Sequence, residues 1–312
     1  MSRAGLWVCL LLFLAPALHA QEVLFGVTTD AGNGMLVRID PATGLCSRVG
    51  NVGTAVFAKI NCLASDPTTG TLFAGHGRLG NLAGTELFRI NPDSAAAALV
   101  GEDTTPPGHP SSLRDLARRP TDGVLFATNL GALATVNPAD GQLTGIGGTA
   151  ARAIEFDPTG VTLFGVNAAP GIGVVDPGTG ALGPTVGLTF VGFPPTFPLQ
   201  GFPRVLTITT RSDGTIFAIV ADRWGGGAPT FLATINPATG ITTNLGETRL
   251  DGADRPAALG LHGIAFHTFA ASGQDDGGGG GDCFVEASRR GEPALLLVVT
   301  LFLAALLRRT RP

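Results

Sequence analysis

The polar residues with the clearest chemical potential fall in one column of five similar short segments. Each segment is apolar overall, and its aliphatic residues alternate with the column. The column is occupied by Asn61, Arg114, Arg152, Leu206 and His262. Arginine forms charge-assisted hydrogen bonds with planar oxyanions, and polar groups that converge in a concave mouth are the usual form of a small-ligand site. The column therefore predicts a ligand-binding site for an acidic group, provided that the five segments meet.

Two carboxylates, Asp115 and Glu155, lie on the same segments, and with His262 they are the candidates for acid–base chemistry. An enzyme would need these side chains to cluster, because acid–base catalysis requires groups within hydrogen-bond reach of the substrate. The simpler interpretation is a solvated channel whose charges satisfy one another. The sequence therefore favours a binding module and leaves the question of an enzyme open.

Other motifs support neither a cofactor nor a metal. Residues 75–80 (GHGRLG) match the pattern GxGxxG, but a strand is expected after them, whereas the dinucleotide fingerprint needs a helix N-terminus. The Asp-Pro-x-Thr-Gly sequences lack the alternating carboxylates of a calcium loop. The chain also has no HExxH and no GxSxG sequence. We therefore expect no cofactor and no metal site.

The five segments belong to a unit that recurs along the body of the chain, residues 21–270. In its best copy, residues 61–75 (NCLASDPTTGTLFAG), two apolar runs flank a Pro-Thr-Thr-Gly turn, as in a β-hairpin. The second strand of each copy carries a Leu/Ile-Phe-Ala/Gly core, at 24–26, 72–74, 125–127, 163–165 and 216–218. The third strand ends in an Asx-Pro turn, at Asp40, Asn91, Asn137, Asp176 and Asn236. Repetition at this period is typical of a propeller or a solenoid.

The ends of the repeat indicate that it closes into a ring. A first strand precedes the Leu-Phe core in four copies, at 60–65, 113–118, 151–156 and 205–210, but the first copy lacks one. The missing strand appears at the other end of the body, at 261–266. A blade built from both termini removes the open sheet edge that would otherwise template aggregation. We therefore predict an all-β fold, a β-propeller of about five four-stranded blades closed by N- and C-terminal strands.

Two features of the body stay open at this stage. The Pro- and Phe-rich insertion at 188–203 could hide a degenerate sixth blade. A disulfide between Cys46 and Cys62 is permitted in an exported protein. However, the two cysteines fall on an outer strand and on an inner strand of the next blade, and a bridge requires Cα atoms within about 7 Å.

The repeat, Leu-Phe-Ala/Gly followed by Ile-Asx-Pro-Ala-Thr-Gly, resembles that of bacterial secreted β-propeller proteins related to the YVTN and NHL repeat families. The resemblance covers residues 23–269 and implies a propeller with a binding or scaffolding role. The chain lacks the Tyr-Val-Thr-Asn motif itself.

The N-terminal residues 1–20 have the pattern of a secretory signal peptide. Arg3 precedes an apolar run at 6–14, and the small residue Ala20 stands at a plausible cleavage point. We therefore expect export. Retention of the N-terminus in the membrane is the alternative, although the apolar run is short for a span.

The C-terminal residues resemble the bacterial sorting tags that consist of a Gly/Cys motif, a membrane helix and an Arg-rich end. A Gly-rich linker occupies 271–282, and the tag at 283–312 contains Cys283, an apolar run at 294–307 and a final arginine cluster. The resemblance implies a transmembrane helix, a sorting protease as a partner, and processing or lipidation at Cys283. Arginines after the helix favour a cytoplasmic C-terminus and an external propeller. A permanent single-pass anchor is the alternative.

The overall charge excludes one class of partner. The formal net charge is −4, and acidic residues outnumber basic ones between the two termini. Nucleic acid is therefore an unexpected partner, because an acidic surface repels phosphates. The sequence predicts an exported propeller displayed at the cell envelope, which binds a small molecule, a glycan or a protein. A propeller-type glycan lyase or hydrolase with its site at the channel mouth, and a structural envelope component, are the alternatives.

Overall fold

The computed structural model describes residues 21–28, 34–52, 60–77, 85–103, 113–129, 131–195, 197, 203–221, 229–251 and 260–269. All of them belong to the first of two units, residues 1–271. The expected signal peptide, linker and sorting tag, including Cys283, lie outside the described residues. Within the described ranges, no helix has the length and apolar character needed to cross a membrane.

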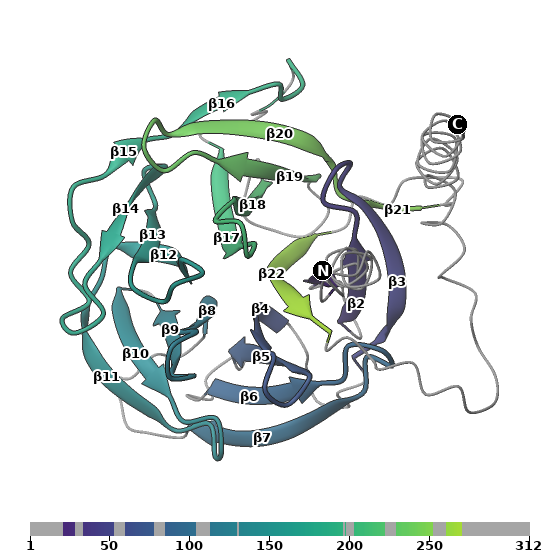
Figure 1. Cartoon of the computed structure of the whole chain (residues 1–312), viewed down its shortest axis with the longest axis vertical. Coiled ribbons are helices and arrows are strands. Elements are labelled where there is room, and N and C mark those ends of the chain that lie inside the picture. The colour runs from purple at the N-terminus through teal and green to yellow at the C-terminus, as the bar shows by residue number, and fades with distance from the viewer. Residues whose placement is uncertain are drawn as a thin grey trace, which may run out of the picture. The chain divides into compact units, whose positions relative to one another are not determined.

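The strands form five sheets arranged in a ring, and these sheets are the blades of a propeller (Figure 1). Blades 2 to 5 each use one continuous stretch of chain. The strands of blades 2 and 3 are Ile60–Asp66 (β4), Thr71–Gly77 (β5), Thr85–Ile90 (β6), Ala97–Asp103 (β7), Asp115–Arg118 (β8), Leu125–Asn129 (β9), Ala132–Val136 (β10) and Leu143–Gly148 (β11). Those of blades 4 and 5 are Ala151–Phe156 (β12), Leu163–Asn167 (β13), Gly171–Val175 (β14), Val186–Gly187 (β15), Thr189–Val191 (β16), Arg204–Thr210 (β17), Ile216–Ala221 (β18), Thr230–Ile235 (β19) and Ile241–Glu247 (β20).

Blade 1 takes strands from both ends of the body, which confirms the predicted closure. Its sheet order is β21-β3-β2-β1-β22, and its strands are Glu22–Thr28 (β1), Met35–Ile39 (β2), Leu45–Asn51 (β3), Arg249–Leu250 (β21) and Leu261–Thr268 (β22). β1 pairs with β2 on one side and with β22 on the other, so that Leu24 lies opposite both Ile39 and Phe266. The C-terminal strand β22 is therefore the innermost strand of the blade that begins the chain.

The inner strands of neighbouring blades contact one another all the way around, in the order β22, β4, β8, β12, β17 and back to β22. Five hydrophobic clusters fill the five boundaries between blades. At the boundary of blades 1 and 2, for example, Phe25 and Leu36 pack with Leu63 and Leu72, all fully buried. Burying one such side chain contributes about 1.5–3 kcal/mol. The core is thus divided among the blade boundaries.

The Asx-Pro turns adopt the conformation that their sequence predicts. In the first, Asp40 Oδ1 accepts a hydrogen bond from Ala42 N (2.9 Å) and Oδ2 accepts one from Thr43 Oγ1 (2.7 Å). Gly44 completes the turn with φ of 76°, in the left-handed region that favours glycine. The Asp, Thr and Gly therefore serve the backbone turn.

Glycines on three of the outer strands, Gly101, Gly147 and Gly246, explain how blades dock at the rim. The outer strand of one blade runs along the rim toward the turn of the next blade (Figure 1). A Cβ on Gly246 would lie 1.9 Å from Thr43 O, and a Cβ on Gly101 would lie 1.9 Å from Asp140 O. Because such distances are shorter than any van der Waals contact, only glycine fits at these points.

The two open features of the body are resolved by the structure. Within the described residues, the insertion forms no sixth blade; its strand β16 pairs in parallel with β20 and so adds an edge strand to blade 5. Cys46 and Cys62 are free thiols, buried in different boundary clusters. The disulfide is therefore not formed, because the two cysteines lie on different blades, as the strand assignment had suggested.

Candidate functional site

The predicted column coincides with a β-bulge in four of the five inner strands. In four blades the pairing register shifts at this position, so that Asn61, Arg152, Leu206 and His262 have no partner residue in the ladder. In blade 3 the residue at this position is Arg114, which donates from N to Thr128 O (2.9 Å) just before β8 begins. A bulge redirects its side chain away from the regular pleat and is common next to functional sites. The five column residues therefore lie at the start of the inner strands, and four of them have no partner in the strand pairing.

Three arginines converge at this end of the inner strands, which we call the arginine mouth (Arg114, Arg152 and Arg204, with Asn61 and His262 in the same ring of bulges). The pKa of Arg114 is lowered, first by burial and then by the nearby charges of Arg152 and Arg204. Thr128 links the two arginine positions, because its backbone O accepts from Arg114 N and its Oγ1 donates to Arg152 O (3.0 Å). Arg114 and Arg152 therefore lie close together at the start of neighbouring inner strands.

Arg204 was missed by the sequence argument. It stands two residues before Leu206, at the start of β17, and so falls outside the column that the aliphatic alternation defines. The Pro- and Phe-rich insertion immediately before it gave no further signal. No described contact joins Asn61 to the arginines, whereas His262 takes part in interactions of its own.

Asp115 lies inside the channel and is fully buried. Its Oδ2 accepts a hydrogen bond from Ile154 N in blade 4 (2.9 Å), and its Oδ1 accepts one from Thr207 Oγ1 in blade 5 (2.9 Å). Burial raises the pKa of this carboxyl well above its ordinary value, although the hydrogen bonds act in the opposite direction. One side chain thus joins three adjacent blades, and its carboxyl is occupied by the protein.

The opposite end of the inner strands holds a pocket of about 250 Å³, which we call the turn pocket. All five inner strands contribute to it near their C-terminal ends, together with the turns that follow them. Its polar lining includes Ser65, Arg118, Glu155, Thr209 and Thr210. Burial raises the pKa of Glu155 well above its ordinary value, and the nearby Asp115 raises it further.

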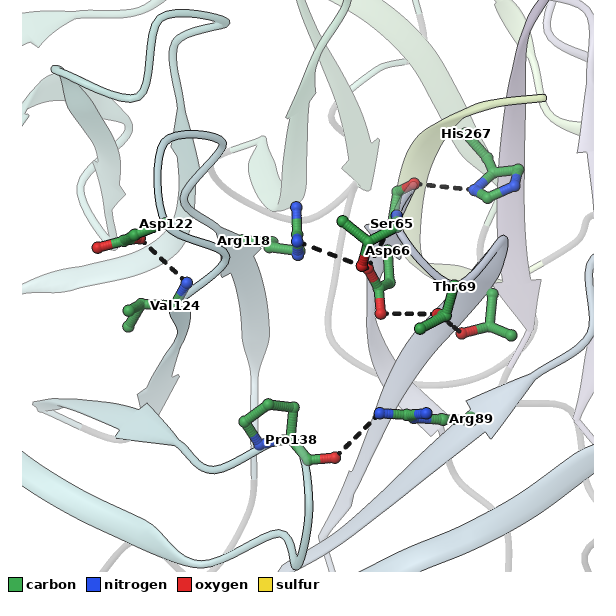
Figure 2. A network of polar contacts seen from close by, with 11 residues as sticks. Ser65, Asp66, Thr69, Arg89, Arg118, Asp122, Val124, Pro138 and His267 are labelled. Carbon is green, nitrogen blue, oxygen red and sulfur yellow. Dashed lines mark hydrogen bonds and ion pairs between the residues drawn. The ribbon is translucent and has the colours of Figure 1, made fainter. Parts of the chain in front are cut away.

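Two polar pairs border the turn pocket (Figure 2). Ser65 Oγ and His267 Nδ1 are 2.9 Å apart, and His267 is buried, which lowers its pKa. Arg118 Nη2 lies 3.5 Å from Asp66 Oδ1. Sequence reasoning did not single out these residues, because the closing strand β22 brings His267 to Ser65 across 202 positions.

The GxGxxG match at 75–80 is described only in part. Its first three residues end β5, Thr71–Gly77, and the next described element is the strand β6. Within the described part of the chain, no group of three or more His, Cys, Asp or Glu side chains is arranged to hold a metal ion. The prediction that no cofactor binds remains a prediction.

Comparison with known proteins adds similarity of structure alone. No family model and no curated protein matches the sequence. Among solved structures, the chain is similar to a chain of the nidogen/laminin complex (12% identity, TM-score 0.47, 79% of this chain and 98% of that chain). It is also similar to Myxococcus xanthus glutaminyl cyclase (20%, 0.42, 67% and 81%) and to the periplasmic gluconolactonase PpgL of Pseudomonas aeruginosa (16%, 0.40, 72% and 81%). With TM-scores below 0.5 these likenesses carry no argument about activity, and the five-bladed propeller rests on the chain's own sheets.

Proposed function

We propose that this chain is an exported, envelope-displayed propeller that binds an acidic ligand, a carboxylate or a similar planar oxyanion, at the arginine mouth. The observation that carries the proposal is the convergence of three arginines from three adjacent blades. The guanidinium group stays charged and offers a planar fork of donors that matches a carboxylate. An anion bound between them would contact all three charges.

The position of the arginines supports binding more than architecture. Like charges at one mouth repel one another, and the bulge that carries Arg152 interrupts the ladder. Both features favour an anion as the ligand. Display at the envelope rests on the sequence alone, on the signal-peptide pattern at 1–20 and the sorting-tag pattern at 283–312.

The enzyme alternative, a glycan lyase or hydrolase, is less well supported. Glycoside hydrolysis commonly uses two carboxyl groups about 5–10 Å apart, both in contact with the substrate. Of the two predicted carboxyls, Asp115 is fully buried and bonded to two neighbouring blades, and Glu155 lines the turn pocket. Glu22 and Asp157 also line that pocket, but Glu22 accepts hydrogen bonds from Ser212 and Asp157 accepts them within its own turn, so neither is poised as the second catalytic group.

The proposal is tested by calorimetric titration with acetate, succinate, citrate and glucuronate at low ionic strength. We expect at least one of them to bind, more weakly as salt is added, and replacing Arg114 and Arg152 together by Ala to reduce the affinity at least tenfold. A matched control replaces Arg48 and Arg211, which have partners elsewhere on the protein. Equal binding by the two double variants would show that the arginine mouth is only a solvated channel.

A further inference from the structure

The turn pocket is a second candidate site, at the other end of the inner strands from the arginine mouth. Its volume of about 250 Å³ is just below the 300–1,000 Å³ or so that encloses drug-sized ligands. An occupant must therefore be compact, about the size of one six-membered ring with its substituents. Because all five blades line the pocket, the ring closure itself creates it.

The charged groups around the pocket are already satisfied by the protein. Glu22 accepts hydrogen bonds from Ser212 N (3.2 Å) and Ser212 Oγ (2.8 Å), and Arg118 lies opposite Asp66. Asp157 accepts hydrogen bonds within its own turn, from Val161 N and Thr162 N. An ionic ligand would have to displace one of these partners, so the pocket disfavours a charged group.

The lining also carries groups that can act as neutral donors and acceptors, although Glu155 Oε1 already accepts a hydrogen bond from Phe156 N (2.8 Å). Glu155 stands on the lining, and burial raises the pKa of its carboxyl, which makes it a donor as well as an acceptor over a wider pH range. The hydroxyls of Ser65, Thr209 and Thr210 lie on the same lining. Ser65 Oγ is paired with His267 Nδ1 and Thr209 Oγ1 accepts from Phe266 N (3.4 Å), whereas Thr210 Oγ1 has no hydrogen-bond partner among the described residues. Such groups match alcohols, which both donate and accept.

Much of the remaining lining is apolar. Phe156 and Phe266 stand beside Pro67, Pro120 and Pro158. A compact ring with hydroxyls on its edge and C–H groups on its faces would place each part against a suitable wall. We propose that the turn pocket binds one ring of a neutral, polyhydroxylated ligand, that is, a single sugar residue. This site is independent of the anion site proposed above.

The test is saturation-transfer NMR on the full chain with glucose, galactose, mannose and N-acetylglucosamine, and with glucosamine and glucuronate as charged comparators. We expect transfer to at least one neutral sugar. Thr210→Trp, which fills the pocket, should abolish the transfer, while replacing Arg114 and Arg152 by Ala should change it less than twofold. Transfer to no neutral sugar, or to charged sugars alone, would overturn the proposal, as would transfer that survives Thr210→Trp or is lost with the two arginines.

Glu155 provides a second and milder pair of variants, in case the bulky residue prevents folding. Glu155→Gln keeps a neutral donor and acceptor of the same shape, and we expect its sugar affinity to stay within about threefold of that of the wild type. Glu155→Ala removes both and should weaken binding at least tenfold. Equal affinities for the two variants would overturn the assigned role of Glu155. Thermal unfolding of each variant checks that it is folded.

Discussion

Arg114 and Arg118 bracket the same short strand, β8, yet their surroundings are opposite. Arg114 stands among other arginines, which lower its pKa together with burial. Arg118, at the other end of the strand, lies 3.5 Å from Asp66 and borders the turn pocket. A repeated scaffold can thus carry unlike chemistry at its two ends, because the residues that differ between blades lie at the ends of each strand.

The connections at the two ends differ as well. At the turn pocket, tight turns link the first two strands of blades 2 to 5, and each ends in a glycine with positive φ: Gly70, Gly123, Gly160 and Gly214. At the arginine mouth, the connections between blades are unequal. Only two residues separate β11 from β12, whereas the insertion stands before β17. Loops of unequal length on a constant scaffold are where binding functions usually lie.

Removing β22 should have the largest effect on stability, because this strand contributes residues to both the arginine mouth and the turn pocket. A chain that stops after Gly260 exposes an edge of β1 that β22 covers, and we expect it to aggregate and lose cooperative unfolding. A chain that stops after Ala271 retains β22 and is the matched control. Size-exclusion chromatography and thermal unfolding distinguish them. A monomeric shorter chain of equal stability would mean that the ring needs no closure.

Asp115 lies on β8 between the arginine mouth and the turn pocket. Its replacement should cause the next largest loss of stability. Asp115→Ala leaves the donors of Ile154 and Thr207 buried without their acceptor, and we expect the free energy of unfolding to fall by about 3–5 kcal/mol. Urea unfolding measures it. Asp122→Ala, at a surface ion pair with Arg119, should cost at most about 1 kcal/mol. Similar losses for both would show that Asp115 does not hold the blades together.

Substitutions at the rim test whether the stability of the propeller depends on the close spacing of neighbouring blades. Gly101→Ala would place a Cβ 1.9 Å from Asp140 O of the next blade, so the blades must separate. We expect a loss of about 1–3 kcal/mol in unfolding free energy. Gly145→Ala is the control, because no atom lies within 4 Å of its added Cβ, and it should be neutral or slightly stabilising. Thermal unfolding measures both variants. A melting temperature of Gly101→Ala at or above that of Gly145→Ala would contradict the prediction.

The blades and their closure were predictable because their signals are local. The Asx-Pro turn, the Leu-Phe core and the missing first strand are each visible within a few residues of sequence, and turn chemistry fixes them. The need for glycine at Gly246 was not predictable, because it depends on the approach of Thr43 O in the turn of the next blade.

The sites were predictable only where they share a column. Arg114 and Arg152 occupy equivalent positions, so aligning the copies was sufficient to bring them together. Asp115 is adjacent to that column, but its burial follows from packing against blades 4 and 5, which no alignment of copies contains. The pair of Ser65 and His267 joins the second blade to the last strand and appears only when the ring is closed. Tertiary contact, rather than pattern, creates the turn pocket.

The comparison of Arg114 with Arg118 makes a direct prediction about stability. Arg118→Ala removes the charged partner of Asp66 and should lower the unfolding free energy by about 1–2 kcal/mol. Arg114→Ala removes one of three like charges, which offsets its lost packing, so we expect less than half that effect. Added salt provides a check. Because salt screens charges, the two variants should differ less in their loss of unfolding free energy at high ionic strength. A larger loss at Arg114 would indicate that the arginine mouth is architectural.

Two carboxyls near the turn pocket should respond to pH in opposite directions. The pKa of Glu155 is raised above its ordinary 4.5, chiefly by burial, so the folded protein holds a proton that the unfolded chain releases. Stability from Glu155 is therefore present below pH 4.5 and lost as the pH rises. Burial also raises the pKa of Asp66, but hydrogen bonds from Thr68 and Thr69 and the charge of Arg118 outweigh it, and the net shift is downward from 3.8. Stability from Asp66 is therefore present above pH 3.8 and lost as the pH falls.

The smallest effects should appear when each carboxyl is replaced by its amide and unfolding is followed from pH 3 to pH 8. Glu155→Gln cannot titrate, so its stability relative to the wild type should improve steadily as the pH rises above 4.5. Asp66→Asn should be destabilising at neutral pH, because the amide loses the charge that faces Arg118, and its penalty should shrink as the pH falls through 3.8. The two difference curves therefore diverge with increasing pH. If they run parallel, Glu155 shares the charged state of Asp66, and the pocket presents a carboxylate where we have inferred a neutral acid.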